Sequence, residues 1–411
     1  MEKNSIKQNI IEVKSQLRSL QDVKKSFETA SSNIKREVEH IQNMQSKEIP
    51  VIPEIDYKSI VSGSVSNFQI AEIKRRGSLI IRNVFDEQQA NEWNDEVGEY
   101  ILTNDYFSKS IDKAGMDQYF SQLKSGAPQI FGIYWSKPQM LARQSKSMAN
   151  TKKFLNSLWD VSTSTGDEFD PNQDYVYADR IRRREPGDVS LGLSPHIDGG
   201  SFERWVDLGF QKVYSSVFNG DFSSYDPWKA AYRTQTREYK SPAVCSMFRT
   251  FQGWTALTSQ GPSDGTLSLI PITNSMSYIL LRALQDDISP DNLCDAEPGR
   301  PLNISSKYHE DLIAGLISIP AVRPGDTVWW HPDIAHSVAD KHSGKDYSNV
   351  MFIGASPKCQ KNLNYAKMQT QKFLQGKSPP DFAAEDYEVD FSGRFTVDEL
   401  SDLGCIQMAI Q

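Results

Sequence analysis

The 411-residue sequence has only four cysteines and no CxxC pair. They stand far apart, at Cys245, Cys294, Cys359 and Cys405. This scatter argues against a disulfide framework and against a zinc site built from thiolates. A cytoplasmic chain with reduced thiols is the expected reading.

Long apolar runs and an excess of basic residues are also missing. The longest apolar segments, "MSYILLRAL" and "GSLIIRNVF", fall far short of the roughly 20 residues that span a bilayer. The start, "MEKNSIKQNII", has no apolar core of a signal peptide. A net charge of −8 argues against a general nucleic-acid binder. We therefore expect neither a membrane nor a nucleic acid as partner.

Residues 1–47 are polar and predict a helical N-terminal arm. Apolar residues recur at three-four spacing, at Ile10, Val13, Leu17, Leu20, Phe27, Ile34, Val38 and Ile41. One interpretation is a coiled coil that forms a homodimer. The other, which we favour, is an amphipathic helix or helix pair folded onto its own domain, because Lys24 and Ser31 interrupt the seam.

The rest of the chain predicts an α+β fold. Residues 48–69, with two prolines in "EIPVIPEIDY", read as a linker, and residues 70–375 as the main domain. A C-terminal tail, 376–411, is expected to pack on the core. Short strand-like segments begin near Tyr175, with helices before and between them. Periodicity alone leaves barrel, sandwich and jelly roll open.

The most informative motif is "SPHIDGG", in which His196 and Asp198 stand one residue apart. Residues two apart in a strand point the same way, so both side chains could meet one ion. His336, in "RPGDTVWWHPDIAHSV", is the best candidate for a third ligand. Two histidines and one carboxylate on one face form the triad of non-haem iron oxygenases, which leaves coordination positions open.

Three segments together resemble a known enzyme group: "SPHIDGG", "FQGWTALTSQGPSDGTLSLIP" and "RPGDTVWWHPDIAHSV". They resemble the Fe(II)/2-oxoglutarate-dependent oxygenases of the phytanoyl-CoA-hydroxylase type. The nearest resemblance is to a bacterial and fungal oxygenase-like family catalogued as a domain of unknown function. It spans roughly residues 70 to 360 and implies a double-stranded β-helix (jelly-roll, cupin-like) core. It also implies Fe(II), 2-oxoglutarate and O₂ as cofactors, with His196, Asp198 and His336 as iron ligands.

The sequence departs from that group at the 2-oxoglutarate anchor. Many members have an arginine about ten residues after the second histidine, but "DYSN" at 346–349 has none. A buried dianion needs a positive partner, and the arginine fork suits a carboxylate. Arg249 is the first candidate, with Thr255 as a hydroxyl donor on the same strand face. Arg182 and Arg184 are the runners-up.

Other segments carry weaker expectations. Residues 202–240, rich in aromatics, are expected to form a lid over the site, a packed helical satellite, or both at once. His331 is expected in the core or behind the ligands, and His309 and His342 at the surface. Beyond His336, the alternating residues Asn349, Met351 and Ile353 are expected to line the pocket.

The expected function is oxidation of an unactivated C–H bond in a small metabolite, by hydroxylation, desaturation or ring closure. An amino acid or another carboxylate would suit the arginines. Two alternatives remain open at this point. One is a cupin-like metal enzyme that does not use 2-oxoglutarate, which the missing arginine favours. The other is a non-catalytic jelly-roll binding protein, which an intact triad disfavours.

Overall fold

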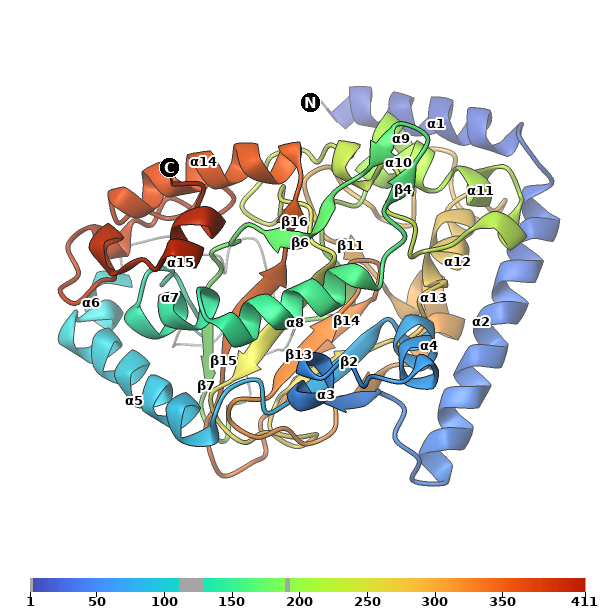
Figure 1. Ribbon diagram of the computed structural model, residues 1–411. Helices are drawn as coiled ribbons and strands as arrows, with labels where there is room; N and C mark the ends of the chain where they lie inside the picture. The colour runs from blue at the N-terminus through green and yellow to red at the C-terminus, as the bar shows by residue number, and fades with distance from the viewer. Residues whose placement is uncertain (1–2, 111–128, 189–192, 411) are drawn as a thin grey trace.

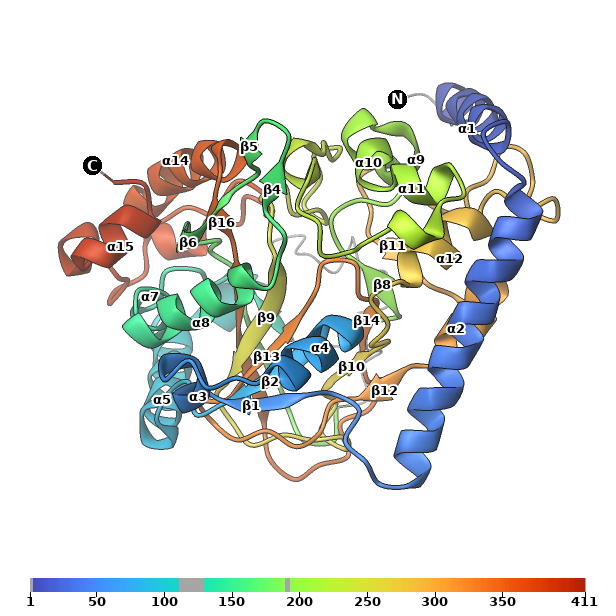
Figure 2. The ribbon, with the colours of Figure 1, turned by 45° about the vertical axis from the view of Figure 1, so that its right-hand side comes forward.

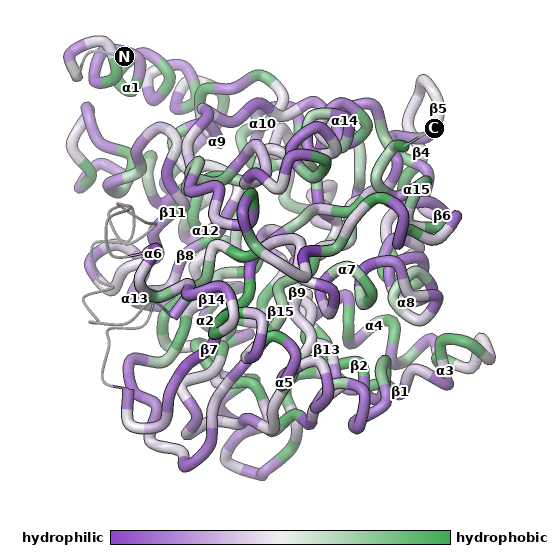
Figure 3. Tube along the Cα trace, turned by 90° about the vertical axis from the view of Figure 1, so that its left-hand side faces the viewer, coloured by the Kyte–Doolittle hydropathy of each residue, from purple (hydrophilic) through white to green (hydrophobic). Residues whose placement is uncertain are grey.

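The computed structural model describes residues 3–110, 129–188 and 193–410. Helices surround two β-sheets in a mixed α+β arrangement (Figure 1). The tube coloured by hydropathy shows hydrophobic residues on the strands inside and hydrophilic residues along the loops at the lower edge (Figure 3). The apolar residues of the strands thus form the interior of the molecule.

The larger sheet has seven strands. Their spatial order is β1 (Glu54–Asp56), β2 (Ser78–Arg82), β13 (Thr327–Trp330), β9 (Phe251–Ala256), β15 (Ser348–Ala355), β7 (Ile181–Arg184) and β3 (Ile130–Phe131). All neighbours pair antiparallel except β1 and β2, which are parallel.

The smaller sheet has five strands. Their order is β11 (Leu302–Asn303), β8 (His196–Ile197), β14 (His336–Val338), β10 (Leu267–Leu269) and β12 (Ile317–Ser318), all antiparallel. Between β7 and β15 the chain passes repeatedly from one sheet to the other. Strands β7, β9, β13 and β15 belong to the larger sheet, and the even-numbered strands between them belong to the smaller one.

The two sheets face each other across one shared apolar core. Alternating residues of the larger sheet, such as Trp254, Val328 and Val350, pack in one cluster with Leu267 and Leu269 of the smaller sheet. The intervening residues Phe251, Trp329 and Met351 join a second cluster under the helices of the outer face. Strand alternation therefore gives each strand an inner side toward the opposite sheet and an outer side toward helices.

Helices cover both outer faces (Figures 1 and 2). One group lies over the larger sheet: α3 (Tyr57–Val61), α4 (Asn67–Arg76), α5 (Glu87–Thr103), α6 (Tyr106–Ser110), α7 (Lys137–Arg143) and α8 (Lys146–Ser157). The smaller sheet is flanked by α2 (Val23–Ser46), α12 (Ser275–Arg282) and α13 (Ser306–Ile313), while α1 (Lys3–Arg18) lies beside α9 (Glu203–Val206) (Figure 1). The C-terminal helices are α14 (Gln360–Leu374) and α15 (Asp402–Gln407).

Short elements complete the chain. Residues 202–240 contain α9 (Glu203–Val206), α10 (Leu208–Val213) and α11 (Ser215–Phe218). Two small two-stranded sheets are also present: β4 (Ser162–Thr163) forms a hairpin with β5 (Gly166–Asp167), and β6 (Asp170–Asp174) pairs with the sequence-distant β16 (Pro357–Lys358). Among the described helices, none is long and apolar enough to cross a membrane.

The N-terminal arm is a helix pair packed on its own domain. Ile10, Leu17, Ile34 and Ile41 are buried in the core cluster that includes the smaller sheet. Lys14 is buried as well, and its Nζ donates to the carbonyls of Ile288, Ser289 and Asn292. Most of the apolar stripe considered for dimerisation is thus covered within the chain, whereas Leu20 is 47% exposed.

Residues 48–69, expected to be a linker, contain regular structure instead. Strand β1 extends the larger sheet by pairing Glu54 and Asp56 with β2, and α3 follows directly. The prolines at 50 and 53 precede this strand and do not interrupt it. At the other end, Phe382, Phe395 and Met408 of the C-terminal segment pack in an apolar cluster with Trp135 and Phe373.

Candidate metal centre

The strands β8 and β14 bring the two histidines of the motifs together. His196 opens β8, His336 opens β14, and the two residues are direct partners across the antiparallel pair. Their ring centroids lie 4.4 Å apart. Asp198 follows β8 by one residue, and the turn continues through Gly199 and Gly200 at φ 87° and 92°. These left-handed conformations favour glycine, so the "DGG" turn has a backbone reason for its sequence.

Asp198 lies between the two imidazoles. Its Oδ1 is 3.5 Å from His196 Nε2, and its Oδ2 is 3.7 Å from His336 Nε2. One ligand atom from each of the three residues lies within 4.8 Å of the others, and within the described ranges this is the group that could hold a metal ion. Two nitrogens and a carboxylate oxygen are the donor set that suits non-haem iron.

Backbone carbonyls orient both imidazoles. His196 Nδ1 lies 2.7 Å from the carbonyl oxygen of Ser194, and His336 Nδ1 lies 3.3 Å from that of Ile334. A carbonyl oxygen can only accept, so each Nδ1 carries the proton and donates. The lone pair of each ring is then on Nε2, the atom that faces Asp198. Metal-binding histidines are commonly held by such a backbone contact.

The charges of the site fit a ligand set. Burial opposes ionisation of Asp198, but the close contact with His196 and the charges of His336 and Arg249 hold the pKa of its carboxyl below the usual range. Burial, with repulsion from His196, lowers the pKa of His336 to about 3. Burial opposes a charge on His196 as well, but its contact with Asp198 raises the pKa of that imidazole. Metal binding needs both imidazoles neutral beside the ionised carboxylate, so a metal ion would compete with a proton at His196.

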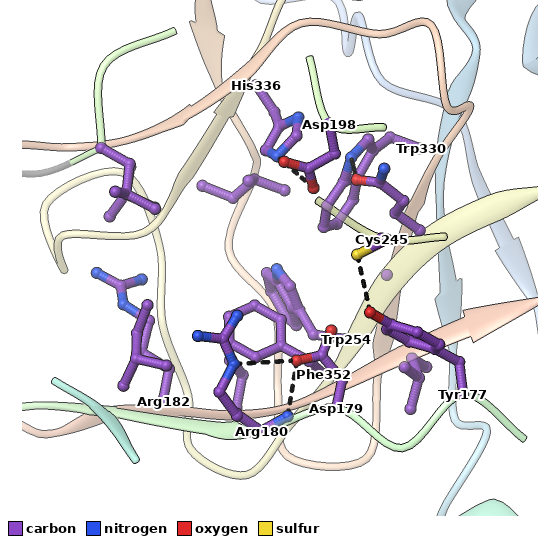
Figure 4. Close-up of a pocket in the computed structure, with 18 of the residues that line it drawn as sticks. Tyr177, Asp179, Arg180, Arg182, Asp198, Cys245, Trp254, Trp330, His336 and Phe352 are labelled. Atoms are coloured by element: carbon purple, nitrogen blue, oxygen red, sulfur yellow. Dashed lines mark hydrogen bonds and ion pairs between the residues drawn. The ribbon is translucent and has the colours of Figure 1, made fainter. Parts of the chain in front are cut away.

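A cavity of about 110 Å³ opens beside this group. His196, Asp198 and His336 line it, and in Figure 4 His336 and Asp198 lie on one side while Arg180 and Arg182 lie on the other. An apolar wall of this cavity is formed by Trp254, Trp330 and Phe352. A second cavity, of about 60 Å³, shares Asp198, Cys245, Arg249 and Gln252 with the first, so the two meet at the candidate ligands.

Arg182 lines the cavity away from the triad. It is 7% exposed, and its Nη2 donates to the carbonyl of Gly265 at 3.1 Å. No carboxylate lies within ion-pair distance of it in the parts of the chain that the structure describes. Burial and the charge of Arg184 lower the pKa of Arg182 to about 9. Its guanidinium thus faces the cavity with Asp188 as a counter-charge beyond ion-pair distance.

Arg249 lines both cavities beside the triad. It is also 7% exposed, and its guanidinium lies 5.2 Å from the ring centroid of Tyr177. Over the described ranges it makes neither a hydrogen bond nor an ion pair. A Cβ at position 354 would lie 2.9 Å from Arg249 Cδ, so Gly354 leaves the room that the arginine stem occupies.

Arg184 and Thr255 are not brought to the cavity. Arg184 is fully buried and donates to the carbonyls of Gly265, Ala339 and Asp340. Thr255 lies on the outer side of β9, opposite Met351 and Thr327. Its Oγ1 has no hydrogen-bond partner among the described residues. Arg249 precedes β9, so strand alternation does not fix its direction relative to Thr255.

The other side-chain expectations have mixed outcomes. The inner residues of β15 that line the cavity are Val350 and Phe352. Of the three residues expected to line it, Ile353 does so. Asn349 instead donates a hydrogen bond to Asn94 on α5. His331 is a core residue stacked on Trp159. His309 and His342 are buried, not exposed, and each ring accepts a backbone N–H, from Ser305 and Gly344.

The 202–240 insertion is a packed satellite in this structure. Phe202, Trp205 and Tyr214 are fully buried in the main core, and Trp228 packs under the outer helices. Little in the sequence indicates what the polar residues of this segment do. Arg204 and Arg233 form buried ion pairs with Asp333, which stands three residues before His336. The only sequence signal is the aspartate inside "WWHPDIAH".

Known proteins match this chain over nearly its whole length. The Gig2-like family profile matches residues 4–410. The uncharacterized protein YbiU of Escherichia coli K12 is 43% identical over 384 residues, which cover 93% of this chain and 91% of YbiU.

Two solved structures extend the comparison. A Salmonella typhimurium LT2 protein described as "Putative Oxidoreductase" superposes with a TM-score of 0.95 at 42% identity, covering 98% of this chain and 97% of that one. GlcNAc Inducible Gene 2 of Candida albicans gives a TM-score of 0.82 at 28% identity, with 98% and 89% covered.

Proposed function

The chain belongs to the Gig2-like family, and on that premise we propose that it is a non-haem Fe(II)- and 2-oxoglutarate-dependent oxygenase of a small, carboxylate-bearing metabolite. The observation that carries the proposal is the triad. Two imidazole Nε2 atoms and a carboxylate converge at the wall of a cavity, with both Nδ1 atoms committed to carbonyls. The name of the Salmonella relative points to the same broad class.

The strand order supports a double-stranded β-helix as the core, in the phytanoyl-CoA-hydroxylase manner. Eight strands divide between two facing sheets, in the orders β7-β15-β9-β13 and β8-β14-β10-β12. Both histidines then come from adjacent strands of the smaller sheet, and the cavity lies between the sheets. This arrangement would give the ion a dry, rigid setting.

When bound, ferrous iron and 2-oxoglutarate would supply the oxidising chemistry: O₂ converts 2-oxoglutarate to succinate and CO₂ while a substrate C–H bond is oxidised. His196, Asp198 and His336 would hold the ion. Trp254, Trp330 and Phe352 would exclude water, which strengthens charge interactions inside the cavity. The protein thus orients the reactants and leaves the hard chemistry to the cofactors.

We assign the far carboxylate of 2-oxoglutarate to Arg182. A guanidinium has five N–H donors, and Arg182 uses one contact on the carbonyl of Gly265. Its position across the cavity from the triad suits a co-substrate that reaches from the ion to a distant anchor (Figure 4). This arginine would replace the one missing after His336.

Arg249 would bind the substrate. A divalent ion, Asp198, a dianionic co-substrate and Arg182 balance in charge, so Arg249 would remain an unpaired buried cation. The nearby Asp179 is paired with Arg180 at 3.3 Å. Asp381 accepts from Ser246 and Tyr177, and burial raises the pKa of its carboxyl. A substrate carboxylate would supply the missing negative charge.

The test is anaerobic addition of Fe(II) and 2-oxoglutarate to the metal-free protein, recording the visible charge-transfer band of the chelate. We expect the band in wild type and none in His196→Ala, whereas the buried but remote His309→Gln should retain it. Arg182→Gln should weaken 2-oxoglutarate binding at least about 30-fold, since it removes one partner of a buried charge pair. Arg249→Gln should change that affinity less than about threefold.

Other outcomes would redirect the proposal. Loss of 2-oxoglutarate binding in Arg249→Gln with retention in Arg182→Gln would exchange the two roles. Tight metal binding without a band would favour a metal enzyme that does not use 2-oxoglutarate, which the absence of arginine at 346–349 also favours. Absence of metal binding would leave a non-catalytic binding protein.

A further inference from the structure

A buried polar cluster lies beside the candidate metal ligands. Asp333, whose side chain is 2% exposed, accepts from Tyr214 Oη at 2.8 Å and from Arg233 Nη2 at 2.7 Å. Arg204 Nη1 lies 2.6 Å from Tyr214 Oη and 3.3 Å from Asp333 Oδ1. Three of the four residues come from the 202–240 insertion. The fourth lies in the loop between β13 and β14.

Arg204 connects this cluster to the turn that carries Asp198. Its Nη2 donates to the carbonyl of Asp198 at 2.9 Å, and its Nε donates to the carbonyl of Gly200 at 3.0 Å. The turn contains two consecutive glycines with positive φ. Glycine has the greatest backbone freedom of any residue, so these two hydrogen bonds restrict a segment that would otherwise be soft.

Asp333 connects the cluster to the segment that carries His336. Its backbone N–H donates to His331 Nδ1 at 3.1 Å, and His331 is held in turn by the carbonyl of Pro227 and by stacking on Trp159. Three donors fix the carboxylate of Asp333 itself. The chain between β13 and β14 therefore has few ways to move without breaking buried ionic contacts.

We infer that Arg204, Tyr214 and Asp333 position the metal ligands, and that the 202–240 insertion works as a brace between the Asp198 turn and the His336 loop. This inference rests on the proposed metal site. None of the three residues is one of the candidate ligands, so they are positioning residues. The insertion would set the metal affinity by holding the two ligand-bearing segments in place, and the Arg204 guanidinium would connect it to the Asp198 turn.

The sign of the expected effect separates positioning from simple electrostatics. Arg204 is a cation beside the backbone of Asp198, so its charge alone disfavours a metal cation. Neutralising it would tighten metal binding if charge were its only influence. A residue that matters only for folding would leave the affinity of the folded protein unchanged. Positioning alone predicts weaker binding.

The experiment is equilibrium Co(II) binding to the full-length protein, followed by the visible d–d spectrum well below the unfolding temperature. Arg204→Gln should weaken Co(II) binding about 10- to 100-fold, the usual effect of removing a group that orients ligands. Arg204→Lys keeps the charge but offers one nitrogen, so it should lose nearly as much. Tyr214→Phe removes one hydroxyl and should lose a smaller factor, and it keeps the test open if Arg204 variants do not fold.

A matched control is the ion pair between Lys152 and Asp174, 2.8 Å long, 3% and 8% exposed, and remote from the triad. Asp174→Asn should lower thermal stability yet keep Co(II) affinity within about twofold. Unchanged or tighter binding in folded Arg204→Gln and Tyr214→Phe would overturn the brace. If wild type itself binds no Co(II), the proposed metal site fails first, and the brace falls with it.

Discussion

At the scale of single residues, Glu388 is a buried carboxyl outside the cavity with a strongly raised pKa. It is 1% exposed and accepts hydrogen bonds from the backbone N–H groups of Tyr134 and Trp135 and from Tyr100 Oη. Burial raises its pKa to about 7, even though these donors favour the charged form. Its proton should therefore couple folding to pH.

The sign follows from the two pKa values. The folded pKa of about 7 exceeds the usual 4.5, so between these values the folded state binds more protons than the unfolded state. The contribution to stability is complete below about pH 4.5 and is lost as the pH rises to about 7. The loss amounts to about 3 kcal/mol.

Glu388→Gln tests this coupling, because an amide can keep the backbone contacts with its oxygen and offer its NH₂ to Tyr100. Urea unfolding at pH 5 and pH 8 should show wild type losing about 2.5 kcal/mol more than the variant over that interval. Equal pH dependence in both proteins would mean that Glu388 keeps an ordinary pKa.

Residue-level prediction from sequence succeeded where chemistry and spacing act together. The "HID" spacing and the "PGD" segment brought forward His196, Asp198 and His336, which the structure gathers within 4.8 Å. Which arginines face the cavity could not be predicted from the sequence. Whether Arg249, Arg182 or Arg184 faces the cavity depends on where β9 and β7 begin and on neighbouring carbonyls. Those facts arise from tertiary contacts.

At the scale of elements, α1 and α2 carry an apolar stripe that packs against other parts of the same chain. Ile41 of α2 is fully buried against the core, while Ile11 of α1 lies outside the buried stripe and is 41% exposed. The stripe reads the same in sequence for a coiled coil and for an internal helix. Only the presence of α12 and α13 beside α2 decides between the two.

Ile41→Ala should therefore destabilise the protein by about 2–5 kcal/mol, the range for truncating a buried isoleucine. Ile11→Ala is the matched control and should change stability by less than about 0.5 kcal/mol. Chemical unfolding measures both, and light scattering records the mass. A change of oligomeric state in Ile41→Ala, with stability retained, would show instead that the stripe joins two copies.

Short strands were the weak point of prediction at this scale. Strand β1 has three residues between prolines and a helix, and β8 has two. Segments of this length carry no measurable alternation, so composition suggested a linker at 48–69. Their pairing depends on β2 and on β14, strands that already exist elsewhere in the fold. Long elements such as α2 and β15 can be predicted from the periodicity of their apolar residues, whereas short ones cannot.

At the scale of the whole molecule, metal binding should stabilise the fold. A ligand that binds only the folded state adds free energy in proportion to the logarithm of its concentration over Kd. Co(II) at 100 times its Kd should add about 2.7 kcal/mol to the unfolding free energy of wild type. His336→Ala should gain almost nothing. Equal stabilisation of that variant would place the metal at another site.

The pairing of His196 with His336 across β8 and β14 has a consequence for how the molecule folds. Side chains alternate between the faces of a strand, so a slip of one residue would turn one imidazole toward the helices and away from its partner. Strand β8 has only two residues to specify its alignment. An ion that needs both imidazoles would bind only correctly aligned chains. Metal binding would thereby stabilise the correct strand alignment over misaligned ones.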